Sequence, residues 1–305
     1  MDILSLIKSN YYFQYAEWSR DHKQIIETDL GKRKVYFWND VNTLRWHINW
    51  RHRLNCDAFY VDRMLVTKSG QLFIPFEDGG FLTCHDVLEK RAELEGNERC
   101  WGQFIGAMLN RSLVPEARCL SLLKDKLNRT LDTFEYMNAM EPQMNAGEFQ
   151  AIKHCIPKVW ERIEIMKSLV RETKPAYIPL TTELLPLEKG RWLSGKLFWE
   201  IRQAAPILGY RSFCDFFNHW LAMTNQNSLI SLIETVDEVS PLNRHANQLL
   251  AAFYYPDEWL RMFDAIRYQR QEIQVLYRQF ANEWEMTSRT TAVFYQFLKE
   301  QGYVL

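Results

Sequence analysis

Cys84, His85 and Asp86 place a nucleophile, a base and an acid side by side in the chain. These are the residue types of nucleophilic catalysis, in which a base activates a thiol and a third group orients the base. Neighbouring residues of a strand point to opposite faces of a sheet, so the three side chains cannot form a triad locally. No nucleophile elbow, phosphate-binding loop, dinucleotide-binding loop or H-E-x-x-H motif occurs elsewhere in the sequence.

Two pairs of charged residues and the six cysteines are further candidates for a functional site. Asp57 and Asp62 could serve as a carboxylate pair, although carboxylates at this spacing are usually solvated. Arg211 and Asp215 stand four residues apart, which is typical of an ion pair on the surface of a helix. The six cysteines are scattered and include no C-x-x-C pair. We therefore expect reduced thiols and no metal site.

The first part of the chain is predicted to mix strands with one helix. Residues 34–38 form a short strand-like run, and Asn39 or Asp40 could cap a helix that ends near residue 54. Two β-rich runs, 58–67 and 71–76, flank a Lys-Ser-Gly turn, which predicts a hairpin. A further strand is predicted at 81–87.

The rest of the chain is predicted to be mainly helical. Apolar residues recur at helical spacing over 101–109, 120–134 and 149–170, and again beyond residue 213. Residues 174–195 are rich in proline and are interpreted as a loop or broken strands. With 305 residues, of which 47% are apolar, the chain can form two lobes. The pattern therefore predicts an α+β protein with a β-rich segment at 1–88 and a helical segment at 89–305.

Charge and hydropathy exclude several classes of partner. The 37 basic and 38 acidic residues leave a net charge of -1, so no nucleic-acid partner is predicted. The densest basic cluster, residues 45–53, is interpreted as an amphipathic helix with Trp inside and Arg outside rather than as an RNA-binding surface. No stretch approaches the roughly 20 apolar residues of a membrane span, and the N-terminus does not read as a signal peptide. These features predict synthesis in the cytoplasm and no membrane partner.

Several short motifs resemble the bacterial spore-coat kinase-like family of the CotS and YutH type, in that family's order. Residues 31–36 look like the strand that carries the phosphate-pairing lysine, here Lys34. Residues 66–74 are similar to its T-x-x-G-x-x-Y/F-I/V hairpin, and 81–83 fall where its hinge strand runs. Residues 240–256 resemble its C-terminal element. The resemblance implies a protein-kinase-like bilobal fold related to the aminoglycoside phosphotransferases, with a small antiparallel-sheet N-lobe and a large helical C-lobe.

The same resemblance implies that catalytic residues are missing. Phosphotransferases of this shape carry H-x-D-x-x-x-x-N, then a hydrophobic run and I-D-F/W, because one Asp orients the hydroxyl group and another binds the metal. No Asp after residue 150 has an Asn five residues later, and residues 179–198 contain Glu183 and Glu188 but no Asp, Asn or His. Residues 41–54 contain no acidic side chain that could pair with Lys34. Arg211 and Asp215 match a stretch that some members carry after a degraded metal-binding site.

Three hypotheses follow. The first is a catalytically degenerate kinase-like protein, a pseudokinase, which binds other spore-coat proteins in the spore coat. It would have Lys34 in a degenerate nucleotide cleft and no retained cofactor. The second is an active small-molecule phosphotransferase that uses ATP and Mg²⁺, with Glu183, Glu188 or Asp215 as base or metal ligand. The third is an unrelated helical interaction protein, which a structure without a five-stranded sheet would favour.

Overall fold

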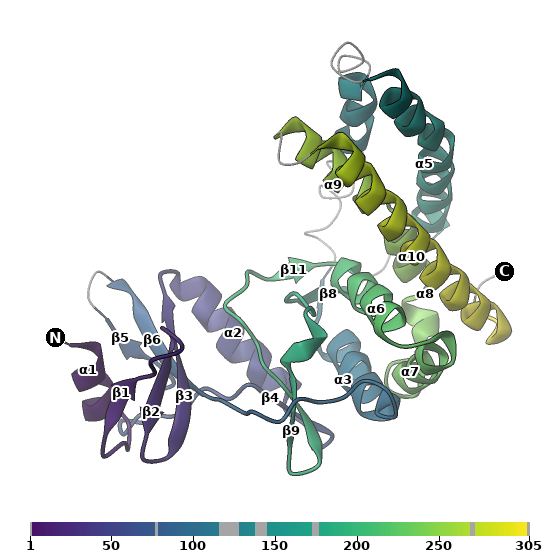
Figure 1. Ribbon diagram of the computed structural model, residues 1–305. Coiled ribbons are helices and arrows are strands. Elements are labelled where there is room, and N and C mark those ends of the chain that lie inside the picture. Colours follow the sequence, from purple (N-terminus) through teal and green to yellow (C-terminus); the bar gives the residue numbers. More distant parts are fainter. Residues whose placement is uncertain are drawn as a thin grey trace.

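The computed structural model describes residues 2–76, 79–115, 128–137, 145–172, 177–268 and 272–303. Figure 1 shows a lobe built around a sheet at the N-terminal end, followed by a larger body of helices. Part of the predicted helical stretch at 120–134 lies outside the described residues, and its remainder belongs to a helical segment at 128–137. The α+β bilobal fold predicted from the sequence is confirmed.

The N-lobe is a five-stranded antiparallel sheet with α1 on one face and α2 on the other. Its strand order is β1-β2-β3-β6-β5, and this five-stranded sheet counts against the hypothesis of an unrelated helical interaction protein. Val35 packs with Ile7 of α1, whereas Tyr36 packs with Leu44 of α2, as the alternation of a strand requires. The elements are α1 Ile3–Asn10, β1 Ala16–Trp18, β2 Ile25–Thr28, β3 Gly31–Trp38, α2 Val41–Leu54, β5 Ile74–Pro75 and β6 Phe81–Asp86.

The predicted hairpin between residues 58–67 and 71–76 is wrong. The turn exists, since the Thr67 amide donates to the Gln71 carbonyl at 2.7 Å, but the strands that flank it separate. β5 pairs with β6, whereas β4 Phe59–Val61 pairs in parallel with β10 of the C-lobe. Beyond Val61 the chain does not continue into a hairpin, because Asp62 is bound elsewhere. The backbone amide of Asp62 donates to the Trp199 carbonyl at 2.8 Å, and the Asp62 side chain lies in a buried polar network.

The residues between the two lobes and after α5 form two small three-stranded sheets. One has the order β4-β10-β9, with β9 Gly190–Leu193 and β10 Lys196–Trp199. The other has the order β11-β8-β7, with β7 Leu113–Pro115, β8 Tyr177–Thr181 and β11 Ile207–Leu208. The segment interpreted as a loop or broken strands therefore contains β8, β9 and a 3-10 turn, Leu187–Lys189.

The described part of the C-lobe has two large hydrophobic cores and a smaller one around Met166 and Leu260. The largest core lies between the two small sheets and the helices α3, α6, α7, α8 and the C-terminal half of α10. It buries Trp101, Phe216 and Trp220. The second holds together a helical arm, seen at the top of Figure 1, around Trp259 and Phe263. The helices are α3 Glu98–Arg111, α5 Ala146–Glu172, α6 Arg211–Met223, α7 Gln226–Val239, α8 Ala246–Tyr254, α9 Asp257–Arg267 and α10 Ile273–Glu300. Within the described residues, no helix is both long and apolar enough to span a membrane.

Candidate functional site

The candidate site lies between the N-lobe sheet and the β9–β10 hairpin. Two cavities, of about 200 Å³ and about 650 Å³, meet there and share Lys34, Arg191 and Glu200 in their walls. The larger cavity extends under the β1–β2 turn, residues 21–24, to the segment that follows β6. The smaller cavity lies against the loop between β8 and β9.

Glu200 is an acidic group of the C-lobe that lines both cavities, and it was not predicted from the sequence. It follows the buried residues of β10, so a hydrophobic run leads directly to a carboxylate. That is the pattern of the metal-binding position with Glu in place of Asp, and a search restricted to Asp passes over it. Burial raises the pKa of the Glu200 carboxyl group, and the positive charges of Arg191 and Lys34 oppose the rise.

Arg191 fills the junction of the two cavities. Its Nε lies 3.4 Å from a Glu200 carboxylate oxygen and donates to the Leu88 carbonyl at 3.0 Å. Its Nη1 donates to the Glu188 and Gly190 carbonyls. Leu88 belongs to the connection between the lobes, so one guanidinium group joins this connection to the loop before β9 and to Glu200.

Two lysines line the smaller cavity. The structure places Lys34 on β3 with its Nζ 5.2 Å from the centre of the Tyr36 ring, and no described carboxylate forms an ion pair with it. Lys189 is buried and donates to the Leu185 carbonyl at 2.6 Å. Burial, reinforced by the positive charges of Arg202 and Lys34, lowers the pKa of Lys189 to about 8, while the carboxylates of Glu183 and Glu200 oppose the shift.

Of the other acidic candidates, Glu188 alone shares a cavity wall with Glu200. Glu183 and Glu188 are both exposed, and Glu188 alone of the two is in the wall of the smaller cavity. Asp215 is on α6 and binds Arg211 at 2.7 Å. The predicted ion pair therefore forms, but Arg211 is largely buried and also lies 2.9 Å from Asp257 of α9. Arg211 thus links two helices of the C-lobe and lines none of the cavities described here.

These residues offer a divalent metal few carboxylates, and Glu200 is already paired with Arg191. Mg²⁺ requires hard oxygen ligands and is usually held by one or more carboxylates and by phosphate oxygens. Among the described residues, no three His, Cys, Asp or Glu side chains come together in a metal-binding group. Glu200 instead contacts a guanidinium group and shares its cavity with Lys34 and Lys189.

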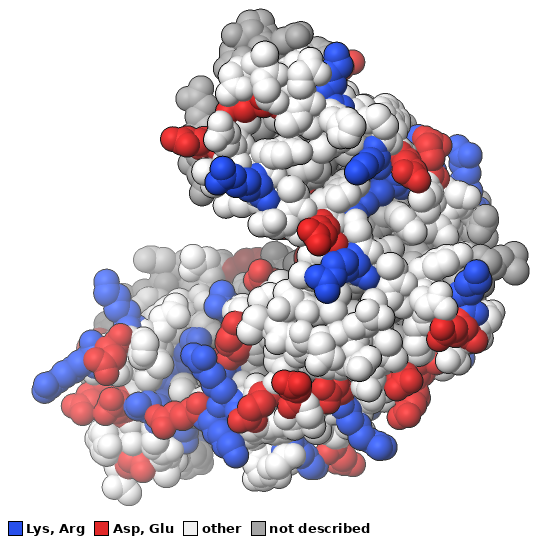
Figure 2. Space-filling view, turned by 45° about the vertical axis from the view of Figure 1, so that its right-hand side comes forward, with Lys and Arg blue, Asp and Glu red and all other residues white. Residues whose placement is uncertain are grey.

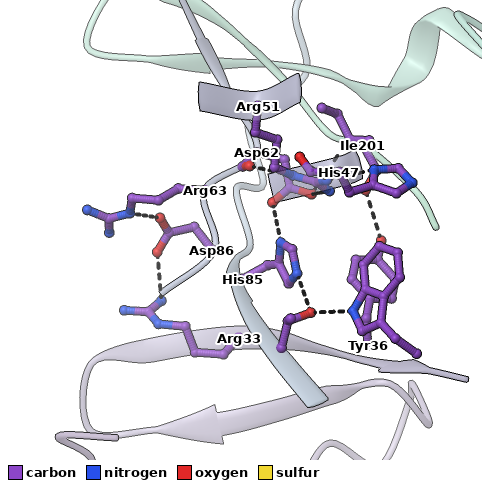
Figure 3. Close-up of polar contacts among 11 residues, drawn as sticks. Arg33, Tyr36, His47, Arg51, Asp62, Arg63, His85, Asp86 and Ile201 are labelled. Carbon is purple, nitrogen blue, oxygen red and sulfur yellow. Dashed lines mark hydrogen bonds and ion pairs between the residues drawn. The ribbon is translucent and has the colours of Figure 1, made fainter. Parts of the chain in front are cut away.

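A buried polar network holds the segment after β10 against the N-lobe, as Figure 3 shows. Asp62 binds His85 Nδ1 at 2.8 Å and Arg51 Nη2 at 3.4 Å, and it accepts the Ile201 amide at 3.3 Å. Burial alone would raise the pKa of Asp62, but its contacts with His85 and Arg51 outweigh burial and the pKa is lowered. The network therefore fixes the backbone next to Glu200.

The network corrects two expectations from the sequence and confirms a third, that Cys84, His85 and Asp86 form no triad. Asp62 is buried rather than solvated, while Asp57 is exposed. Arg51 is buried on α2, as Trp50 is, and does not lie on the exposed face of the helix. His85 contacts Asp62 and not Cys84, whose side chain packs on the opposite face with Val35. Burial raises the pKa of the Cys84 thiol to about 12, so no reactive triad forms.

His47 completes the network as a neutral ring. Arg51 Nη1 can only donate, so it donates to His47 Nδ1 at 2.8 Å, and His47 Nε2 donates to the Ala204 carbonyl at 2.9 Å. Burial, with the charge of Arg51, lowers the pKa of His47 to about 3. His245 of the C-lobe is similar: it binds the Tyr210 hydroxyl at 2.9 Å, and burial lowers its pKa to about 4.

We expect these two histidines to make the protein sensitive to acid. Their pKa values lie below the ordinary value near 6.5, so the unfolded chain takes up protons first as the pH falls. The stability that the neutral rings provide is complete above pH 6.5 and decreases toward pH 4, by up to about 1.4 kcal/mol per pH unit for each ring. Urea unfolding at several pH values measures this slope.

The variant His47→Gln should reduce the slope, since Gln can still accept and donate but does not titrate. His52→Gln, at an exposed position on the same helix, should leave it unchanged. A stability that is flat between pH 7 and pH 5 would contradict the assignment of neutral buried rings.

The fold is similar to that of solved aminoglycoside phosphotransferases and of a choline/ethanolamine kinase family protein. An aminoglycoside phosphotransferase from Alicyclobacillus acidocaldarius superposes with a TM-score of 0.70 at 12% identity, over 98% of this chain and 97% of that one. A spectinomycin phosphotransferase, solved with ADP and spectinomycin, gives 0.53 at 10% identity over 97% of each chain. A choline/ethanolamine kinase family protein from Mesorhizobium loti gives 0.51 at 9% identity over 93% of each chain. No family model and no curated protein sequence matches this chain.

Proposed function

We propose that this chain is a catalytically degenerate kinase-like protein that acts by binding through its interlobe cleft. The observation that carries the proposal is the position of Arg191. Its guanidinium group contacts Glu200, which is the carboxylate best placed to bind a metal, and also occupies the Leu88 carbonyl of the connection between the lobes. Phosphoryl transfer depends on metal ions held by positioned carboxylates, and here the Glu200 carboxylate is paired with a guanidinium group.

The location and the partner are proposed from the resemblance of the sequence motifs alone. These motifs support other spore-coat proteins as partners and the spore coat as the location. A fluorescent fusion of this chain in a sporulating host should follow the coat layer, whereas an aminoglycoside phosphotransferase fused in the same way should stay in the cytoplasm. An even cytoplasmic signal from both fusions would remove this part of the proposal.

An active phosphotransferase is the second candidate. What supports it is that Glu183 and Glu188 stand five residues apart in the loop before β9, which is the spacing of the missing Asp and Asn. Asp215 gives it no support, because its carboxylate binds Arg211 away from Lys34.

Formation of ADP from ATP separates the two candidates. With Mg²⁺ or Mn²⁺ and a panel of amino and hydroxyl acceptors, we expect no turnover above that of buffer. The variants Glu183→Gln, Glu188→Gln and Lys34→Met should give the same background rate. A metal-dependent rate that falls at least tenfold in Glu183→Gln, while the melting temperature is unchanged, would instead establish the enzyme.

A further inference from the structure

Four exposed apolar side chains lie at the outer end of the N-lobe and form what is here the N-lobe patch: Tyr12, Tyr15, Leu30 and Val66. Each is more than half exposed, although exposed apolar side chains that lie together usually mark an interaction site. They come from the link between α1 and β1, the turn between β2 and β3, and the stretch after β4. Figure 1 shows α1 and β1 at the end of the N-lobe away from the helical body, so the C-lobe does not cover them.

One end of the N-lobe patch is basic. Lys68 Nζ donates to the Lys8 carbonyl at 3.0 Å and lies 5.9 Å from the centre of the Tyr12 ring. These contacts hold the stretch that contains Val66 against the end of α1. Both lysines are exposed, and within the described ranges neither forms an ion pair with a carboxylate.

The other end of the N-lobe patch is acidic. The Gln14 amide donates to Asp29 Oδ1 at 2.8 Å, so the chain that leads to Glu17 passes beside the turn that carries Leu30. Both carboxylates are exposed, and no described basic group forms an ion pair with either. Arg33 Nη2 donates to the Leu30 carbonyl at 2.6 Å, but its side chain is only 15% exposed and pairs with a carboxylate at the end of β6.

Opposite charges at its two ends make the N-lobe patch complementary to a second copy of itself. When two copies face each other across a two-fold axis, the basic end of each lies over the acidic end of the other, and the same contact forms twice. The apolar side chains then meet between the charged ends and lose their water. On the face that Figure 2 presents, basic and acidic side chains are interspersed, with no extended region of one sign that would select a partner of the opposite charge.

We propose that the N-lobe patch joins two copies of this chain in a two-fold symmetric dimer. The inference goes beyond the proposed binding role of the cleft, because no residue of the patch is in the walls of the two cavities there. Four apolar side chains are few for a standard interface of about 800 Å² a side, so we expect a dimer that dissociates on dilution. Because exposed charges guide its assembly, the dimer should also be weaker at high salt.

Sedimentation equilibrium of the full chain over a range of concentrations tests the proposal. The dissociation constant of the dimer should rise by about tenfold or more in Lys8→Glu and in Glu17→Lys, because each reversal puts like charges opposite one another at two places. The matched control Lys299→Glu, which also changes an exposed lysine in the last turn of a helix, should dimerise as the unaltered chain does. Tyr15→Ser should weaken the dimer, whereas Tyr177→Ser, on β8 and equally more than half exposed, should not.

A mixture of the two charge-reversed variants forms the second arm. At a concentration where the unaltered chain dimerises, Lys8→Glu and Glu17→Lys should each be mostly monomeric alone, and their equimolar mixture should dimerise because opposite charges meet again. A chain that carries both reversals should likewise dimerise with itself.

The proposal is overturned if the unaltered chain is monomeric at every concentration, or if its dimer is unaffected by Lys8→Glu and Glu17→Lys. It is also overturned if the mixture of the two folded variants stays monomeric, because the dimer would then depend on another surface. None of these outcomes bears on phosphoryl transfer, so the proposed function stands or falls by its own test.

Discussion

Asp62→Ala is expected to lower the free energy of unfolding by about 3–5 kcal/mol, because it leaves Arg51 charged and buried without a carboxylate. The side chains of Arg51 and Asp62 are only 7% and 4% exposed, so the charge of Arg51 loses its partner in a largely buried position. His85 Nδ1 and the Ile201 amide lose their acceptor as well. Urea unfolding measured by tryptophan fluorescence gives the loss.

Two companion variants test the cause of this loss. Asp264→Ala breaks an ion pair with Arg129 whose side chains are 48% and 58% exposed, and it should cost no more than about 1 kcal/mol. The double variant Arg51→Met/Asp62→Ala should be more stable than Asp62→Ala, because it also removes the buried charge. Equal losses in Asp62→Ala and Asp264→Ala would show that the buried network contributes little.

The same variant should loosen the cleft. Asp62 is bonded on both sides of Glu200, through its own amide to the Trp199 carbonyl and through its carboxylate to the Ile201 amide. In Asp62→Ala, amide hydrogen exchange at residues 199–204 should accelerate more than exchange in α7. Uniform acceleration over the whole chain would mean that the variant only lowers global stability.

Gly102→Ala is expected to cost about 3 kcal/mol, at the upper end of the usual cost of overpacking. Gly102 of α3 packs against α7, and an added Cβ would lie 2.5 Å from the Thr235 Cβ and 2.9 Å from the Leu232 carbonyl oxygen. Gly106 makes the same approach one turn later, where a Cβ would lie 2.7 Å from that of Val239. Since a backbone atom forms part of each contact, rotation of a side chain cannot relieve it and the helices must separate.

Gly147→Ala is the matched control for this prediction. Gly147 lies in the first turn of α5, where the nearest atom to an added Cβ is the Asn145 amide oxygen at 3.4 Å. Alanine there should raise stability by up to about 1 kcal/mol through its better helix propensity. A Gly102→Ala variant as stable as Gly147→Ala in urea would contradict the close packing of α3 against α7.

Local sequence by itself determined the cap of α2, several of the elements and the absence of the catalytic Asp and Asn motif. Asp40 caps α2 as its type predicts, accepting the Asn42 and Thr43 amides at 3.0 Å, because a cap depends on residues within one turn. The strand around Lys34 and the long helix through residues 149–170 were likewise predictable from periodicity. The absence of the Asp and Asn motif is a property of the sequence and needs no structure.

The tertiary structure decided which of these residues meet. β4 could have paired with its neighbour across the Ser69-Gly70 turn, yet it pairs with β10, more than 130 positions away in the chain. Arg51 and Asp62 look like ordinary surface residues in sequence, but packing of α2 against the segment after β10 buries them together. Glu200 shares a cavity with Lys34 only because that same segment is bound to the N-lobe. Burial and long-range pairing depend on contacts summed over the whole chain, whereas caps and periodicity depend on a few neighbouring residues, so only the folded molecule could show the positively charged cleft.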